Sequence, residues 1–222
     1  MRYVILFFFI GFLSFGQTFN DGSNDERYFE DQFYLGLSYN FLLNHPEGSN
    51  QRNLSYGLSA GLIKDIPINP RGTYAIGIGA GIALNSYYSN LVANLSGDAI
   101  VYSIEDNITR SKLETHLIEF PVELRWRNST IEEYKFWRIY TGIKAAYVAG
   151  ARSKFVSDTA SDGFYNTDLS KFQYGLTLSF GYNTFNLHAY YALTNLFDGK
   201  ASVNNEILQY KPLRIGLIFY IL

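Results

Sequence analysis

The sequence has no cysteine, one methionine and two tryptophans among its 222 residues. The lack of cysteine excludes a disulfide framework, a thiolate zinc site, a cysteine nucleophile and a lipid-modified N-terminal cysteine. A basic surplus is also missing, because 18 Lys and Arg stand against 20 Asp and Glu and the formal net charge is -2. A chain with this balance does not suit a phosphate backbone, so we expect no nucleic acid partner.

Long apolar runs are missing as well. Hydrophobic residues make up 47% of the chain, but they are not gathered into stretches of the roughly 20 apolar residues that a membrane-spanning helix needs. The excess lies instead in 19 tyrosines, 18 phenylalanines and 19 glycines. Aromatic residues favour strands and glycine favours turns. A length of this size fits one domain, and the composition predicts that the domain is built from strands.

The first residues resemble a secretory signal peptide. Arg2 provides a positive start, and an apolar run follows from Val4 to Leu13. Small residues occupy both key positions of Ser14-Phe15-Gly16, ahead of a cut before Gln17. The apolar run is shorter than a transmembrane helix requires. We therefore expect residues 1–16 to be removed on export.

A polar leader over residues 17–31 is followed by a domain over residues 32–222 in which apolar residues recur at every second position. This is the period of a strand. Ile76 and Ile78, for example, alternate with Gly77 and Gly79. Eight segments carry the pattern: 33–43, 54–62, 74–84, 118–126, 137–147, 173–182, 185–194 and 213–221.

The connections between these segments alternate between long and short. The long ones cover residues 44–51, 86–111, 152–170 and 195–209, and the short ones cover residues 65–72, 128–135 and 183–184. In an up-and-down meander, alternate connections lie at the same end. Long external loops and short periplasmic turns are typical of outer membrane barrels. The sequence predicts an all-β, eight-stranded antiparallel up-and-down transmembrane β-barrel.

The alternative with the same periodicity is a soluble, lipocalin-like ligand binder with its apolar face inside. One face of the strands is rich in Gly, Ser, Ala and Thr, and the other in Leu, Ile, Val, Phe and Tyr. Eight strands enclose a space only wide enough for side chains or one small ligand, so the small residues fit inside more easily. Aromatic residues near the strand ends are expected to form interfacial girdles: Tyr39, Phe41, Tyr87, Tyr88, Trp126, Phe136, Trp137, Tyr182, Phe185 and Tyr210.

Two stretches resemble known outer membrane proteins of Bacteroidota. The run Leu117 to Arg125, LIEFPVELR, resembles the fourth-strand signature of the PorT family. The resemblance implies an outer membrane barrel and, for the named member of that family, a part in type IX secretion and gliding. The end of the chain is similar to the last-strand signal read by the barrel-assembly machinery, with Leu222 as an extra residue. In that signal the matching residues are Arg214, Gly216, Phe219 and Ile221.

The strongest cluster of charges falls on the face predicted to line the lumen. Its members are Glu119, Glu123, Arg125, Arg138 and Lys144. These residues could form a selectivity ring or an ion path of a narrow channel. They could instead pair with one another and fill the interior, because unpaired buried charge is very costly. We favour the paired ladder, and expect Pro121 to mark a bulge or distortion of its strand.

No pattern indicates catalysis, a cofactor or a metal. The three histidines, His45, His116 and His188, are scattered. His188 could pair with a luminal serine or glutamate in a lipid-modifying enzyme, but no nucleophile elbow accompanies it. The spacing of residues 21, 23 and 25 resembles part of a calcium loop, without the glycine and glutamate of an EF-hand. Residues 158–160, Asp-Thr-Ala, resemble a glycosylation sequon of exported Bacteroidota proteins.

The expected partners are outer membrane lipid around the apolar face and an envelope protein at the long loops. Loops 86–111 and 152–170 are the predicted solvent-facing surface. The first contains more apolar residues than a solvated loop requires, and residues 99–104 alternate like a strand. Two interpretations remain open for it: an extension of the barrel that packs on itself, or a docking surface.

Overall fold

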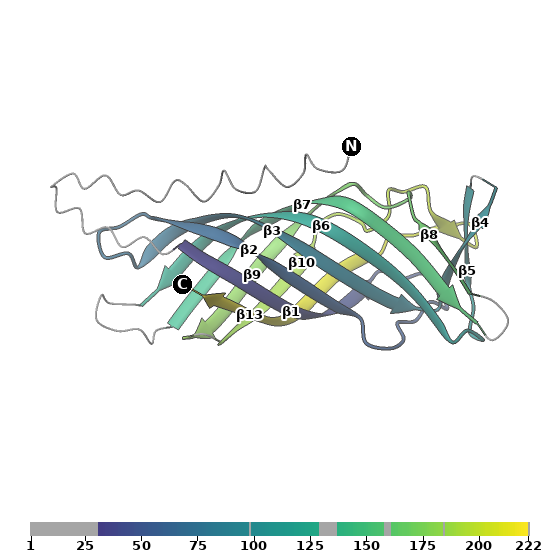
Figure 1. The fold of residues 1–222 in the computed structure, drawn as a ribbon, viewed down its shortest axis with the longest axis horizontal. Coiled ribbons are helices and arrows are strands. Elements are labelled where there is room, and N and C mark those ends of the chain that lie inside the picture. Colours follow the sequence, from purple (N-terminus) through teal and green to yellow (C-terminus); the bar gives the residue numbers. More distant parts are fainter. Residues whose placement is uncertain (1–30, 98, 129–136, 158–160, 184, 222) are drawn as a thin grey trace, which may run out of the picture.

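The computed structural model describes residues 31–97, 99–128, 137–157, 161–183 and 185–221. Eight long antiparallel strands close into a barrel, which confirms the predicted fold (Figure 1). These strands are β1 (Asp31–Leu43), β2 (Tyr56–Pro67), β3 (Tyr74–Ser89), β6 (Arg110–Arg127), β7 (Trp137–Val156), β9 (Phe172–Tyr182), β10 (Phe185–Ala192) and β13 (Lys211–Ile221). Each pairs with its neighbour along the chain, and β1 pairs with β13 to close the wall.

Five short strands lie in the long connections. They are β4 (Leu91–Ser96), β5 (Ala99–Ile104), β8 (Ser161–Tyr165), β11 (Ser202–Val203) and β12 (Glu206–Ile207). β4 pairs with β5, β11 pairs with β12, and β8 extends the sheet along β7. In Figure 1, β4, β5 and β8 lie at the end of the barrel opposite the end of β13. The two ends therefore differ, with elaborated connections at one and short turns at the other.

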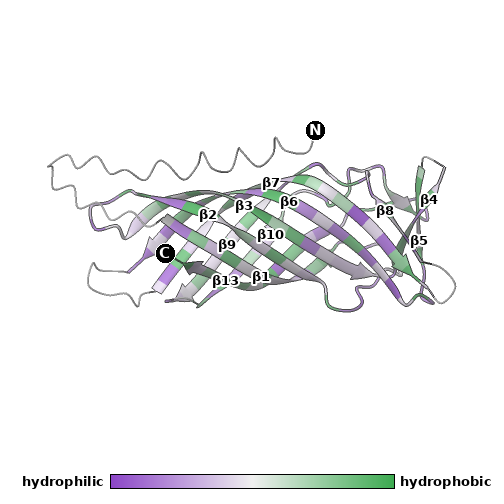
Figure 2. Cartoon of the chain, in the orientation of Figure 1, coloured by the Kyte–Doolittle hydropathy of each residue, from purple (hydrophilic) through white to green (hydrophobic). Residues whose placement is uncertain are grey.

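Alternation along each strand places large apolar side chains outside and small or polar ones inside. In β9, Leu176 and Leu178 are exposed, whereas Thr177 and Ser179 are buried. Figure 2 shows the same alternation of hydrophobic and hydrophilic residues along the barrel strands. An apolar outer wall of this kind belongs in lipid. The lipocalin-like alternative, with its apolar face inside, is wrong.

Two strands are much longer than their apolar pattern. β6 begins at Arg110 rather than near Ile118, and β7 continues to Val156 rather than ending near Tyr147. They remain paired to their outer ends, where Arg110 lies opposite Val156. The outward residues are charged there, so the apolar period disappears although the ladder of hydrogen bonds continues.

Pro121 interrupts a ladder but does not produce a bulge. It has no N–H to donate, and the β3–β6 pairing skips the positions around it while keeping the same register on both sides. The register shift lies instead in the β6–β7 pairing, where His116 pairs with Gly150 and Leu117 with Val148, so that Ala149 of β7 is the extra residue. The expected distortion is therefore present, and its form differs from a bulge.

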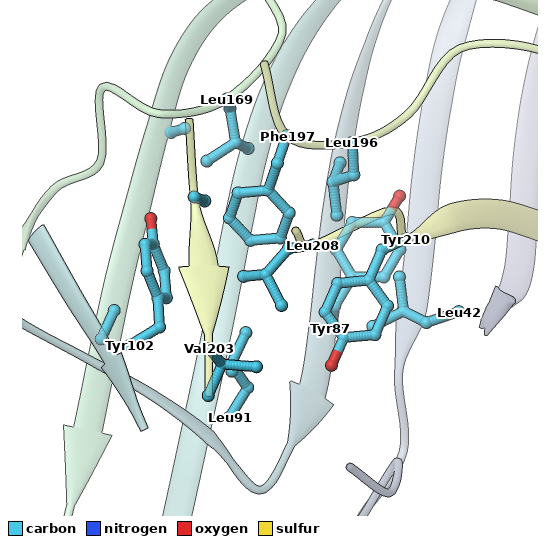
Figure 3. Packing of buried hydrophobic residues seen from close by; sticks show 13 residues of the cluster. Leu42, Tyr87, Leu91, Tyr102, Leu169, Leu196, Phe197, Val203, Leu208 and Tyr210 are labelled. Carbon is cyan, nitrogen blue, oxygen red and sulfur yellow. The ribbon is translucent and has the colours of Figure 1, made fainter. Parts of the chain in front are cut away.

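The connections at the elaborated end fold over the barrel mouth as an apolar cap (Figure 3). Its members are Leu42, Tyr87, Leu91, Ala93, Tyr102, Ala151, Leu169, Leu196, Phe197, Ala201, Val203, Leu208 and Tyr210. Phe197 contacts two tyrosine rings, with centroids 5.5 Å from Tyr102 and 6.0 Å from Tyr210. The extension of loop 86–111 thus packs mainly on the other connections of this end.

Two of the expected girdle residues belong to this cap. Tyr87 and Tyr210 are each only 1% exposed, because their rings lie inside the barrel mouth. Trp137 follows the prediction, since it is exposed on the outer wall and stacks on Phe180 with ring centroids 5.2 Å apart. An aromatic residue near a strand end can face either way, and only its position in the alternation decides which.

Several predictions fall outside the described residues. These are the signal peptide over residues 1–16, the leader up to residue 30, the partial calcium pattern, the girdle residue Phe136, the sequon at residues 158–160 and the extra Leu222. Within the described ranges, no helix combines the length and the apolarity needed to cross a membrane.

Candidate functional site

The five charged residues predicted to line the lumen all face inward and are buried. Glu119, Glu123 and Arg125 lie at alternate positions of β6, and Arg138 and Lys144 lie on β7. Glu123 and Arg125 belong to one group of ion pairs, and Glu119 and Lys144 belong to another. The guanidinium of Arg138 lies near two tyrosine rings, 6.0 Å from the centroid of Tyr140 and 5.9 Å from that of Tyr220.

The first group, here called the rim cluster, lies near the short turns and contains Asp65, Glu123, Arg125 and Arg127. Arg125 forms an ion pair with Asp65 and donates from Nε to Glu123 Oε2 at 3.0 Å. Arg127 Nη1 donates to Asp65 Oδ2 at 2.6 Å, and its Nε donates to the Gly72 carbonyl at 2.8 Å. Asp65 therefore joins the two arginines, and the cluster ties β2 to β6.

The rim cluster is also packed against aromatic rings. The Arg125 guanidinium lies 4.4 Å from the centroid of Tyr140 and 5.3 Å from that of Tyr220. A cation over an aromatic face is favourable, more so when both are removed from water. Arg125 thus contacts β2, β6, β7 and β13, and its side chain spans the interior.

The second group, here called the inner cluster, lies farther along the lumen and contains Glu119, Lys144 and Arg214. Lys144 Nζ forms an ion pair with Glu119 Oε2 at 3.0 Å, and Glu119 Oε1 accepts a hydrogen bond from Arg214 Nη1 at 3.2 Å. The Arg214 guanidinium also lies 4.2 Å from the centroid of Tyr190. A single carboxylate therefore bridges cations from β7 and β13.

Sequence reasoning missed three members of these clusters. Asp65 was expected in a turn, but β2 continues to Pro67 and buries it. Arg127 continues the inward alternation of β6, and this signal could have found it. Arg214 was expected in an assembly signal, yet its parity in β13 also places it in the lumen.

The lumen has little free space. The hollow bordered by Glu119, Lys144 and His188 has a volume of about 20 Å³, enough for about one water molecule. Beyond it, the apolar cap covers the mouth. Burial raises the pKa of the phenols of Tyr102 and Tyr210, which both belong to this cap. Both phenols therefore stay protonated, and Tyr210 shares a 2.5 Å hydrogen bond with the Ser49 hydroxyl.

The histidines do not come together. His45 is exposed in a connection, His116 faces outward on β6, and His188 faces the lumen. His188 Nδ1 lies 2.8 Å from Ser179 Oγ. Among the described residues, no carboxylate hydrogen bond to His188 is present, because Glu119 is held by Lys144 and Arg214. A serine hydrolase needs an acid that orients its histidine, and among the described residues no carboxylate takes that position beside His188.

The residues of the expected assembly signal lie along β13. Gly216 faces β1 so closely that an added Cβ would overlap the Leu37 carbonyl oxygen and lie 2.5 Å from Ser38 Cα. Phe219 and Ile221 point outward, and the Phe219 ring centroid is 5.7 Å from that of Phe185. Gly216 therefore permits close approach at the seam that closes the barrel.

The fold agrees with a sequence comparison. Residues 15–198 match the family model described as outer membrane protein beta-barrel domain. The chain belongs to this family. It is thus an outer membrane β-barrel protein, which fits the apolar outer wall. The matched segment includes the strands that carry the rim cluster, and β13 lies beyond it.

Two solved structures show similarity to this outer membrane barrel. Both are of Ail, the attachment invasion locus protein of Yersinia pestis. One, in complex with the heparin analogue sucrose octasulfate, is 12% identical with a TM-score of 0.38, and the other is 13% identical with a TM-score of 0.35. Each alignment covers 86% of this chain and 97% of the Ail chain. No curated protein matches this sequence.

The filled lumen predicts an electrically silent barrel. We expect the protein, reconstituted into a planar lipid bilayer, to show no stable single-channel steps of porin size. The physical reason is that side chains fill an eight-stranded interior and the cap covers its mouth. Reproducible steps of porin size from samples shown to be folded would contradict this.

Proposed function

We propose that this outer membrane barrel is a non-enzymatic structural or interaction protein of the envelope. The observation that carries the proposal is the interior held by two ion-pair clusters beneath an apolar cap. That arrangement favours the role of a rigid scaffold rather than that of a narrow channel. Ser179 and His188 form a hydrogen bond, but no described carboxylate orients His188. This favours a scaffold rather than a lipid-modifying enzyme.

The proposal includes a route to the membrane. The protein is exported through the signal peptide over residues 1–16, which is cut before Gln17, and it is inserted by the barrel-assembly machinery. The end of β13, with Arg214, Gly216, Phe219 and Ile221, provides the signal. A partner protein of the envelope then binds at the elaborated end, where the connections face the solvent.

A more specific role is that of a PorT-like accessory of type IX protein secretion in Bacteroidota. The resemblance of residues 117–125 to the PorT signature favours this role. On this stretch, Glu119, Glu123 and Arg125 are the residues that join the luminal clusters. The signature-like residues therefore have a structural task in this chain, whichever partner the barrel serves.

Deletion of the gene tests the specific role. We expect the deletion strain to lose proteins from its secreted fraction, measured by quantitative proteomics of the culture medium, and to regain them when the intact gene is restored. Folding of the restored protein is checked by its heat-modifiable migration on a gel. An unchanged secreted fraction would contradict the secretion role and leave the general role as an envelope scaffold.

A further inference from the structure

A basic patch lies on the outer wall where the apolar surface ends. It contains Arg110 and Lys112 of β6 and Arg152 and Lys154 of β7, on the outward face at the elaborated end. Farther along β6, the outward positions become apolar from Ile118. Residues in a strand advance by about 3.3 Å each, so the patch begins within a few residues of the lipid-facing surface.

The register brings like charges together in this patch. Lys112 lies directly opposite Lys154, and such a pair is destabilising when nothing compensates it. Glu114 forms an ion pair with Lys112 and lies opposite Arg152. On the described outward faces of β6 and β7 beyond His116, it is the one carboxylate among four cations. The patch therefore carries a surplus of positive charge that suits an anionic group.

An apolar hollow adjoins the patch on its lipid side. Its volume is about 750 Å³, and it is lined by outward residues of several strands, including Leu35, Leu58, Ile82 and Ile118. The small side chains of Ala60 and Ala149 leave a depression in the outer surface here. His116 also borders it, two residues beyond Glu114. The hollow can hold hydrocarbon chains beside the patch.

A second, more polar hollow lies beside the patch, on the side of β7 that faces β8 and β9. It opens where β7 ends its pairing with β9 and begins its pairing with β8. Its volume is about 570 Å³, and its lining includes Tyr165 and Lys171 together with the carboxylates Asp168 and Asp198. Ala149 lines both hollows. Tyr165 lies opposite Arg152 in the β7–β8 ladder, so this hollow is continuous with the basic patch.

We propose that this wall binds a phosphorylated lipid of the outer leaflet. Its acyl chains occupy the apolar hollow, its phosphate contacts Lys112, Arg152 and Lys154, and the rest of its headgroup lies in the polar hollow. Along β6, the apolar outward positions lead directly to these cations, as the acyl chains of such a lipid lead to its phosphate. Phosphate accepts strong charge-assisted hydrogen bonds from Arg and Lys, and cations beside a membrane add to the binding of anionic headgroups.

Titration of the full barrel in uncharged maltoside micelles with phosphorylated lipid A, followed by native mass spectrometry, tests the proposal. We expect a saturable complex with wild type and roughly 10- to 30-fold weaker binding by the double variant K112Q/K154Q. Each cation beside the membrane contributes about 1 kcal/mol, and about 1.4 kcal/mol corresponds to a tenfold change in affinity. The matched control K64Q/R71Q removes two cations near the other end and is expected to bind like wild type. Heat-modifiable migration confirms that each variant is folded.

Three further arms separate the sources of binding. Dephosphorylated lipid A is expected to bind weakly, inorganic phosphate alone to bind far more weakly than the lipid, and A149W, which fills both hollows without changing charge, to weaken lipid binding. Equal binding by K112Q/K154Q and wild type would overturn the proposal. It would be overturned equally by full-strength binding of dephosphorylated lipid A, by inorganic phosphate binding as tightly as the lipid, or by an unaffected A149W.

Discussion

Replacement of Arg125 by alanine is expected to lower the free energy of unfolding by about 3–5 kcal/mol, the usual cost of removing one partner of a buried ion pair. Arg125 and Asp65 are completely buried, and Arg125 also holds Glu123. Without its guanidinium, Glu123 loses its hydrogen-bonded cation and Asp65 keeps Arg127 alone. The measurement is urea-induced unfolding of the barrel in micelles, followed by the fluorescence of Trp126 and Trp137.

The matched control is an exposed ion pair in the same chain. Arg52 and Asp106 are 2.5 Å apart, but their side chains are 38% and 74% exposed. Water screens such a pair, so R52A is expected to change the free energy of unfolding by about 1 kcal/mol or less. Equal losses for R125A and R52A would mean that the lumen is well hydrated, against the sealed interior described above.

Replacement of Gly142 by alanine is expected to lower the free energy of unfolding by about 1–3 kcal/mol, the range typical of overpacking. A Cβ at this position would overlap the Val122 carbonyl oxygen and lie 2.8 Å from Glu123 Cα. Both obstacles are backbone, so no side chain can rotate away from the new methyl group. The β6–β7 ladder must shift, and it carries both ion-pair clusters.

Gly150 provides the control on the same strand. A Cβ at Gly150 would meet only His116 Cδ2, at 3.9 Å, which is an ordinary contact. Neither glycine needs a positive φ, so alanine also restricts the unfolded chain at both positions. G150A is expected to be neutral or slightly stabilising in the same urea titration. A loss in G150A as large as that in G142A would show that steric overlap with β6 is not the cause.

The barrel could be predicted because lipid and lumen act on alternate residues of every strand. Apolar and small residues therefore alternate over segments as different as 74–84 and 173–182, and their parity gave the correct face for Glu119, Arg125 and Lys144. The pattern weakens where lipid ends. Between Arg110 and Ile118, both faces of β6 carry polar residues. The strand continues there through backbone hydrogen bonds, which leave no periodic signal in the sequence.

The partners of the luminal charges were harder to predict because they depend on register. Asp65 lies in the stretch Asp-Ile-Pro-Ile-Asn-Pro, whose prolines and asparagine resemble a turn. Its place opposite Gly77 in the β2–β3 ladder carries it into the lumen beside Arg125. The cap could not be predicted from the sequence for a similar reason. Leu91 and Leu208 come from distant connections and meet only in the closed barrel.

The pairing of β1 with β13 makes the nascent chain vulnerable until its last strand is in place. Phe33 lies opposite Ile221, so the two strands that complete the ladder are the first and the last strands of the barrel along the chain. Before they meet, both present unpaired N–H and C=O groups, together with an apolar face, and strand edges of this kind recruit other strands and aggregate. Contacts between such distant residues also form slowly. The unclosed barrel therefore has two strand edges that remain prone to aggregation until the seam forms.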